Sequence, residues 1–120
     1  MRRAFEHDPH RFRQALRKPA RLHLLKLCNM FQDLDGVGAE LHYLLDRAGR
    51  EVDFLVTVDG KPWFTVEAKV ATTTIERSLR FFLDRLRIPW AYQITLDGQQ
   101  DFVQDGIRCL PARQFFGALQ

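Results

Sequence analysis

Two acidic residues and one basic residue in the middle of the chain are of types that can hold a divalent metal and act on a phosphate group. Asp53 is followed, after residues 54–66, by Glu67, Ala68 and Lys69. A pair of carboxylates can hold Mg²⁺ together with waters and a substrate phosphate. A lysine beside them can orient or deprotonate the attacking water, or stabilise charge in the transition state. Asp53, Glu67 and Lys69 are therefore candidate catalytic residues, and Asp53 and Glu67 are candidate ligands of Mg²⁺ or Mn²⁺.

Alternating apolar and polar residues predict that antiparallel strands carry this candidate site. The alternation runs over residues 40–46, 51–58 and 63–70, with turn residues at 48–49 and 59–60 between the runs. Asp53 lies in the second predicted strand, and Glu67 and Lys69 lie two residues apart in the third. Because successive side chains of a strand point to opposite faces, Glu67 and Lys69 are expected to share a face.

The register between the second and third strands decides whether the candidate residues meet. A two-residue turn at 59–60 would pair Asp53 with Val66, which sets a polar residue against an apolar one. A three-residue connection at 59–61 pairs Asp53 with Glu67 instead, and we expect this register. Asp53, Glu67 and Lys69 then share a polar face. The expected apolar face holds Leu41, Tyr43, Leu45, Val52, Phe54, Val56, Val58, Phe64, Val66 and Ala68.

The same charged residues also have a purely structural interpretation. Alternating charge on a half-buried strand is ordinary, and an ion pair between Glu51 and Lys69 would suit a solvated sheet face. Spacing alone favours this second interpretation.

Helical patterns flank the strands. We expect a first helix that begins at Pro19 and ends before the loop at 35–38, because proline suits the first helical turn. Its buried residues are expected to be Leu22, Leu25, Leu27, Cys28, Met30, Phe31 and Leu34. A capping-box pattern at 73–76 predicts the start of a second helix, which ends before Pro89.

The remaining pattern predicts a fourth strand over 90–96, a short fifth strand around 107–110, and a final helix opened by Pro111. The predicted fold class is α/β, more closely an α+β domain with a mixed sheet and helices against it.

Length, charge and composition limit the classes of function. The chain has 120 residues, a hydrophobic fraction of 46% and a formal charge of +3, which indicates one globular domain. The excess positive charge lies in residues 1–18, so we expect a basic N-terminal arm at 1–18 and a domain at 19–120. No apolar run could span a membrane, and no signal peptide or phosphate-binding loop is recognisable, so a cytoplasmic location is expected. Cys28 and Cys109 are expected to be core residues.

The block Asp53 … Glu67-Ala68-Lys69 resembles the D-x(n)-E-x-K signature of the PD-(D/E)xK nuclease superfamily. The predicted α-β-β-β-α-β order is also the core of that restriction-endonuclease-like fold. A closer resemblance is to the C-terminal domain of unknown function on many prokaryotic AAA-type ATPases. The residues that carry it include His23–Lys26, Leu41–Tyr43, Asp46–Arg47, Arg50–Val56, Lys61–Lys69, Tyr92–Gln93, Gly106–Arg108 and Leu110–Ala112.

The superfamily resemblance implies that Asp53 and Glu67 bind Mg²⁺ or Mn²⁺ and that Lys69 assists hydrolysis of DNA. Val52 replaces the superfamily's proline, a departure that is frequent in that group. Residues 10–32 contain no acidic residue, although many such nucleases use one on the first helix, and this keeps an alternative open. The alternative is a catalytically inactive module that binds nucleic acid or mediates protein contacts, accessory to an ATPase.

Further residues are candidates for supporting roles. Glu40, His42 and Gln93 are expected on the polar face as accessory residues, and Arg77 and Arg80 on the second helix are candidate phosphate contacts. The expected partners are therefore DNA and an ATPase domain or protein. Phe81, Phe115 and Phe116 suggest a homodimer contact or an interface with a further domain, and a place in the core is an equal alternative.

Overall fold

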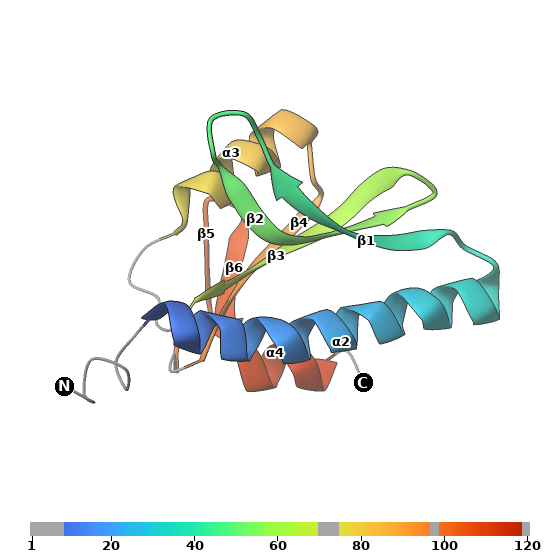
Figure 1. Cartoon of the computed structure of the whole chain (residues 1–120), viewed down its shortest axis with the longest axis horizontal. Coiled ribbons are helices and arrows are strands. Elements are labelled where there is room, and N and C mark those ends of the chain that lie inside the picture. Colours follow the sequence, from blue (N-terminus) through green and yellow to red (C-terminus); the bar gives the residue numbers. More distant parts are fainter. Residues whose placement is uncertain (1–8, 70–74, 97–98, 119–120) are drawn as a thin grey trace.

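The computed structural model describes residues 9–69, 75–96 and 99–118, where three helices pack on a six-stranded mixed sheet (Figure 1). The elements are α2 (Pro9–Asp35), β1 (Ala39–Leu45), β2 (Glu51–Val58), β3 (Lys61–Lys69), α3 (Arg77–Leu86), β4 (Trp90–Thr95), β5 (Phe102–Gln104), β6 (Ile107–Pro111) and α4 (Ala112–Ala118). The expected α+β class with a mixed sheet is confirmed.

The strands lie in the order β1-β2-β3-β4-β6-β5. β1, β2 and β3 pair antiparallel, β3, β4 and β6 pair parallel, and β5 pairs antiparallel with β6. β5 was not predicted, because its three residues carry too little alternation to be recognised. It forms a hairpin through Asp105 and Gly106, both of which have positive φ, as a tight two-residue turn requires.

Helices cover both faces of the sheet. Figure 1 shows α2 and α4 along one face and α3 on the other. The core on the α2 side includes Leu24, Phe54 and Val66, and the core on the α3 side includes Leu79 and Ile107. The candidate site lies in strands that are therefore packed between two layers of helix.

The first helix begins at Pro9, so the expected start at Pro19 is wrong. Pro19 costs the helix one backbone hydrogen bond, but its fixed φ is compatible with helical backbone. Packing offsets that cost, because Ala20, Leu24 and Cys28 form a buried stripe at helical spacing on the sheet. Leu27 and Phe31 pack against the same core. The expected boundary between residues 18 and 19 thus falls within a continuous helix.

Three residues expected in the buried side of this helix are exposed: Leu22, Met30 and Leu34. They lie outside the four-residue spacing of Ala20, Leu24 and Cys28, and therefore point away from the sheet.

The β2–β3 register matches the expectation in the strand interior but not at the turn. Phe54 pairs with Val66 and Val56 with Phe64, as the three-residue connection predicts, whereas Val58 pairs with Lys61. The turn at 59–60 has two residues with positive φ, and a register shift after Val56 restores the interior pairing.

A second irregularity redirects Asp53. The β1–β2 register shifts between His42 and Leu44, so that Asp53 and Phe54 together oppose Tyr43. As a result, Val52 packs in the α3-side core while Phe54 packs in the α2-side core. The expectation that Val52 and Phe54 share a face is therefore wrong.

The same shift changes the outer strand. Tyr43 and Leu45, expected on the apolar face, are exposed, and Leu44 packs against the α3-side core instead.

The second helix begins one turn later than the capping-box pattern suggests. Glu76 is the N-cap residue of α3 and its side chain makes no capping hydrogen bond, because that carboxylate is bound to Lys69. Thr73 and Thr74, the other part of the predicted box, lie outside the described residues.

Candidate active site

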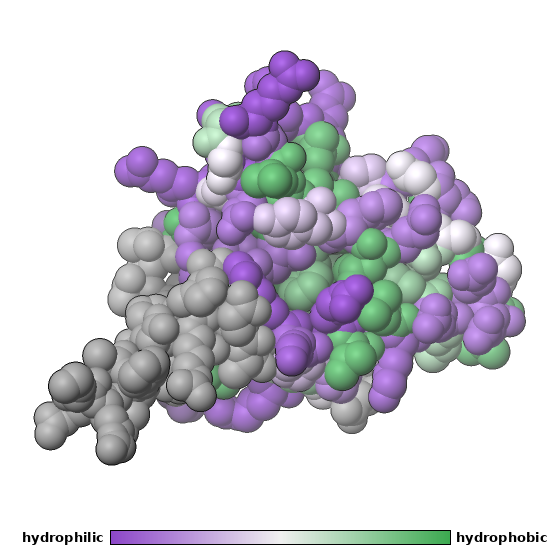
Figure 2. Space-filling model, in the orientation of Figure 1, coloured by the Kyte–Doolittle hydropathy of each residue, from purple (hydrophilic) through white to green (hydrophobic). Residues whose placement is uncertain are grey.

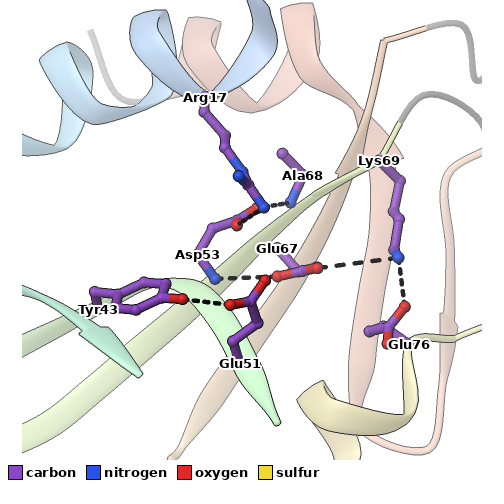
Figure 3. Close-up of polar contacts among 8 residues, drawn as sticks. All are labelled: Arg17, Tyr43, Glu51, Asp53, Glu67, Ala68, Lys69 and Glu76. Carbon is purple, nitrogen blue, oxygen red and sulfur yellow. Dashed lines mark hydrogen bonds and ion pairs between the residues drawn. The ribbon is translucent and has the colours of Figure 1, made fainter. Parts of the chain in front are cut away.

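Asp53 and Glu67 meet in a seam where β2 and β3 no longer pair through their backbones. The Asp53 amide donates to Oε1 of Glu67 at 3.0 Å, and the Ala68 amide donates to Oδ2 of Asp53 at 2.9 Å (Figure 3). Each carboxylate thus replaces a backbone acceptor of the opposite strand. The sequence expectation that Asp53 lies opposite Glu67 corresponds to this arrangement.

The two carboxylates then reach cationic partners on different elements. Asp53 turns towards α2, where Nη2 of Arg17 lies 2.7 Å from its Oδ1 (Figure 3). Glu67 turns towards Lys69, whose Nζ lies 4.0 Å from Oε2. The single polar face expected from the alternation is therefore divided, because the bulge at Asp53 and Phe54 rotates Asp53 towards the helix.

Lys69 is held on the α3 side by Glu76. Its ammonium forms an ion pair with the Glu76 carboxylate, at the N-terminus of α3 (Figure 3). The expected Glu51–Lys69 pair is absent from the described ion pairs, because Glu51 accepts a hydrogen bond from the Tyr43 hydroxyl. Lys69 therefore lies between two carboxylates, Glu67 and Glu76.

Gln93 supports the same side of the site from β4. It is next to Glu67 in the parallel register, is 0% exposed, and accepts a hydrogen bond from the Glu76 amide at 2.9 Å. This bond fixes the start of α3 against the sheet, and with it the partner of Lys69.

Burial separates this site from an ordinary solvated sheet face. Glu67 is 2% exposed and Asp53 is 6% exposed. Removing two carboxylates from water costs several kcal/mol each unless cations and hydrogen bonds compensate. Arg17, Lys69 and the two backbone amides supply that compensation. Asp53 and Glu67 are therefore not solvated, whereas the ion pairs that the structural interpretation expects are present with Arg17 and Lys69 as partners.

A pocket opens between α2 and β1 and reaches Asp53. It has a volume of about 400 Å³, and its lining includes Arg17, Lys18, Arg21, Tyr43 and Asp53. Figure 2 shows hydrophobic surface between the helix along the lower edge and the strands above it, bordered by hydrophilic side chains. Solvent therefore has access to the site from the α2 side.

Residues 24–115 match the family model of a domain of unknown function, DUF4143. This span covers most of the chain. The chain belongs to the DUF4143 family. Searches of curated proteins and of solved structures gave no significant match.

Of the residues of this DUF4143 domain that were expected to support the site, His42 lies beside the pocket at Asp53, whereas the arginines of α3 do not. His42 lines the pocket that reaches Asp53 and hydrogen-bonds to Oγ1 of Thr57 at 3.0 Å. Glu40 is exposed near Cys28. Arg77 and Arg80 are exposed on α3, and Arg80 pairs with Asp105 at 3.1 Å, so neither lines the pocket beside Asp53.

The pKa shifts of the DUF4143 domain identify hydrogen-bonded and buried groups near the site. The hydrogen bond to the Glu51 carboxylate raises the pKa of the exposed Tyr43 hydroxyl. Burial raises the pKa of the Cys28 thiol, with a smaller contribution from Glu40, and burial also raises the pKa of Cys109. Both thiols are therefore core residues, as expected, and are unsuited to nucleophilic roles.

The donor set of the seam fits a divalent cation by type. Two carboxylates together with waters and a phosphate are a usual environment for Mg²⁺. In the structure, Oδ1 of Asp53 forms an ion pair with the Arg17 guanidinium. Within the described residues there is no group of three His, Cys, Asp or Glu side chains placed to hold a metal. A divalent cation at the seam would therefore have only Asp53 and Glu67 as protein ligands among the described residues, and Arg17 would have to leave Oδ1 of Asp53.

Sequence reasoning missed two members of the site. Arg17 was placed in the basic arm, although Leu16, Ala20, Leu24 and Cys28 recur every four residues and indicate a helix that continues through Pro19. Glu76 was interpreted as a capping residue, and no local signal separates that role from binding to Lys69.

Neither the helices of the described ranges nor Phe81, Phe115 and Phe116 point to a membrane span or a dimer contact. No helix in the described ranges has the length and apolarity needed to cross a membrane. Phe115 is buried, and Phe81 and Phe116 pack against the two cores, so intrachain packing accounts for the aromatic residues that suggested a dimer.

Proposed function

We propose that this domain hydrolyses phosphodiester bonds of DNA with the help of Mg²⁺ or Mn²⁺ at Asp53, Glu67 and Lys69. The observation that carries the proposal is the burial of two carboxylates within one hydrogen-bonded seam, beside a lysine and next to a pocket that reaches the surface. Strongly desolvated charged groups that cluster beside a cleft are typical of catalytic sites.

In the proposed reaction, water adds to the phosphorus, the bond to the leaving oxygen breaks, and that oxygen takes up a proton. A bound divalent metal would neutralise charge that develops on the phosphate. The Lys69 ammonium donates hydrogen bonds to the phosphate or to the attacking water, and its ion pair with Glu76 keeps it in place beside Glu67. Asp53 and Glu67 would bind the metal ion at the seam.

The seam itself supplies the preorganisation that such a site needs. Each carboxylate is fixed by a backbone amide of the neighbouring strand, and Gln93 fixes the start of the helix that presents Glu76. Groups that are held in this way need little reorganisation during reaction.

The experiment is a cleavage assay with Mn²⁺ on linear, single-stranded and branched DNA. Lys69→Ala is expected to slow cleavage by on the order of 10²-fold or more, because it removes a charge that stabilises the transition state. Lys61→Ala is the matched control: Lys61 is an exposed lysine at the other end of β3, and this variant is expected to cleave like the wild type. Equal rates for the two variants would contradict the proposal.

A second candidate function is a nucleic-acid-binding module that does not cleave and that acts with an ATPase. The observation that favours it is the ion pair between Arg17 and Asp53, which places an arginine at the carboxylate that a metal would need. If the wild type cleaves none of these DNA substrates but binds them in a separate binding measurement, this second function is selected.

A further inference from the structure

We infer that the pocket between α2 and β1 binds one phosphate group of a nucleic-acid strand through Arg17, Lys18 and Arg21. The inference rests on the proposed function only for the identity of the ligand, because the pocket, its charge and its position follow from the described residues alone. It assigns phosphate binding to α2, and not to the arginines of α3.

The three basic side chains come from adjacent turns of one helix. Arg17 and Arg21 are four residues apart and Lys18 and Arg21 are three apart, so all three lie on neighbouring positions of the helix surface and line the same pocket. Like charges at these spacings repel one another by a few tenths of a kcal/mol each. An anion between them would convert that repulsion into attraction.

The described residues satisfy only part of this positive charge. Arg17 pairs with Asp53, whereas Lys18 and Arg21 are exposed and form no ion pair in the described ranges. The Nε of Arg17 is buried and has no hydrogen-bond acceptor among the described residues. A buried donor without an acceptor is unfavourable, and a turn of the Arg17 side chain into the pocket would let a phosphate oxygen accept from Nε.

The chemistry and size of the pocket favour phosphate over a carboxylate ligand of a small metabolite. Guanidinium groups bind phosphate with paired N–H donors, and two of the three cations are arginines. The volume of about 400 Å³ lies within the usual range of ligand pockets, roughly 300–1,000 Å³, and the pocket is open to solvent. A strand can therefore place one phosphate in it and continue past Asp53.

The position next to Asp53 links this pocket to the seam. Arg17 belongs to both, because it binds Asp53 and lines the pocket. A phosphate that binds Arg17 competes with Asp53 for the same guanidinium. Phosphate binding would thus loosen the contact that occupies Oδ1 of Asp53.

The test is fluorescence anisotropy with a labelled single-stranded oligonucleotide in the presence of EDTA, so that no cleavage contributes. Arg21→Glu is expected to weaken binding about tenfold and to reduce the slope of log affinity against log salt by at least about 0.7, the effect of one lost phosphate contact. Lys26→Glu is the matched control, because it makes the same change of charge on an exposed residue of α2 that does not line the pocket. Lys26→Glu is expected to bind within about twofold of the wild type.

The outcomes separate this inference from the proposed function. Equal weakening by Arg21→Glu and Lys26→Glu, no weakening by either, or no binding by the wild type would overturn it. Thymidine monophosphate serves as a competitor, and tighter binding of this mononucleotide than of the oligonucleotide would contradict a strand as the ligand. Because EDTA removes the metal, failure of the cleavage assay leaves this result unaffected. Arg21 is exposed, so its variant is expected to fold, and circular dichroism checks that it does.

Discussion

The two sides of the β2–β3 seam differ in how they hold a buried carboxylate. On the α2 side, Asp53 is bound by Arg17 next to an open, basic pocket. On the α3 side, Glu67 lies beside Lys69, which is fixed by Glu76 and by the hydrogen bond from Glu76 to Gln93. The first side is open to solvent, whereas the second is packed and hydrogen-bonded. The proposed hydrolysis of a phosphodiester would use both properties, because the substrate must enter while the lysine stays in place.

The difference also concerns which contacts can be exchanged. The Arg17 side chain is 23% exposed and can turn into the pocket or to solvent, so its bond to Asp53 can be given up to a ligand. Gln93 is fully buried, so its bond to the Glu76 amide is part of the packed structure. We therefore expect ligands to exchange contacts on the α2 side and to leave the contacts of the α3 side in place.

The largest expected effect on stability comes from the Arg17–Asp53 pair. Arg17→Ala removes a cation from a buried carboxylate and is expected to lower the free energy of unfolding by about 3 kcal/mol. Asp53→Asn removes the buried charge itself and lets Arg17 turn to solvent, so its cost is expected to be about 1 kcal/mol. Urea denaturation without metal measures both.

The effect of Mn²⁺ on the melting temperature provides a second measurement on the same variants. If Asp53 binds the metal once Arg17 is gone, Mn²⁺ should raise the melting temperature of Arg17→Ala by more than that of the wild type. Equal costs for Arg17→Ala and Asp53→Asn, together with no extra effect of Mn²⁺, would contradict the account in which Arg17 compensates the buried charge of Asp53 and gives way to a metal.

A smaller effect is expected at β4 on the α3 side. Gln93→Leu removes the acceptor of the Glu76 amide and is expected to cost about 1–3 kcal/mol in urea denaturation. Thr95→Val is the matched control in the same strand, because the buried Thr95 hydroxyl has no hydrogen-bond partner in the described residues. This variant is expected to be neutral or stabilising. If Thr95→Val costs as much as Gln93→Leu, the hydrogen bond to Glu76 does not hold the start of α3.

Much of the fold was predictable because it depends on local periodicity. The strand alternation over β2 and β3 and the apolar spacing of α3 each predict an element in its place. The start of α2 was not predictable from Pro19, because tertiary packing of Ala20 and Leu24 outweighs the helix-breaking tendency of one proline.

The site was predictable only in part, for a geometric reason. The pairing of Asp53 with Glu67 follows from the interior register, which the polar and apolar pattern specifies. A bulge adds one residue to a strand without any change of composition, so the rotation of Asp53 towards α2 left no signal in the sequence. Arg17 and Glu76 reach the site from other elements, and their contacts depend on tertiary structure alone.

The most direct test of the account is a calorimetric titration of Mn²⁺ into the wild type and Glu67→Gln. The substituted amide side chain would keep an oxygen that accepts the Asp53 amide, so the seam is preserved while one of the two proposed metal-binding charges is lost. If the buried carboxylates form a metal site, Glu67→Gln should bind Mn²⁺ at least about tenfold more weakly than the wild type. Equal binding by the two proteins, or no binding by the wild type, would contradict the proposed metal-dependent site at Asp53 and Glu67.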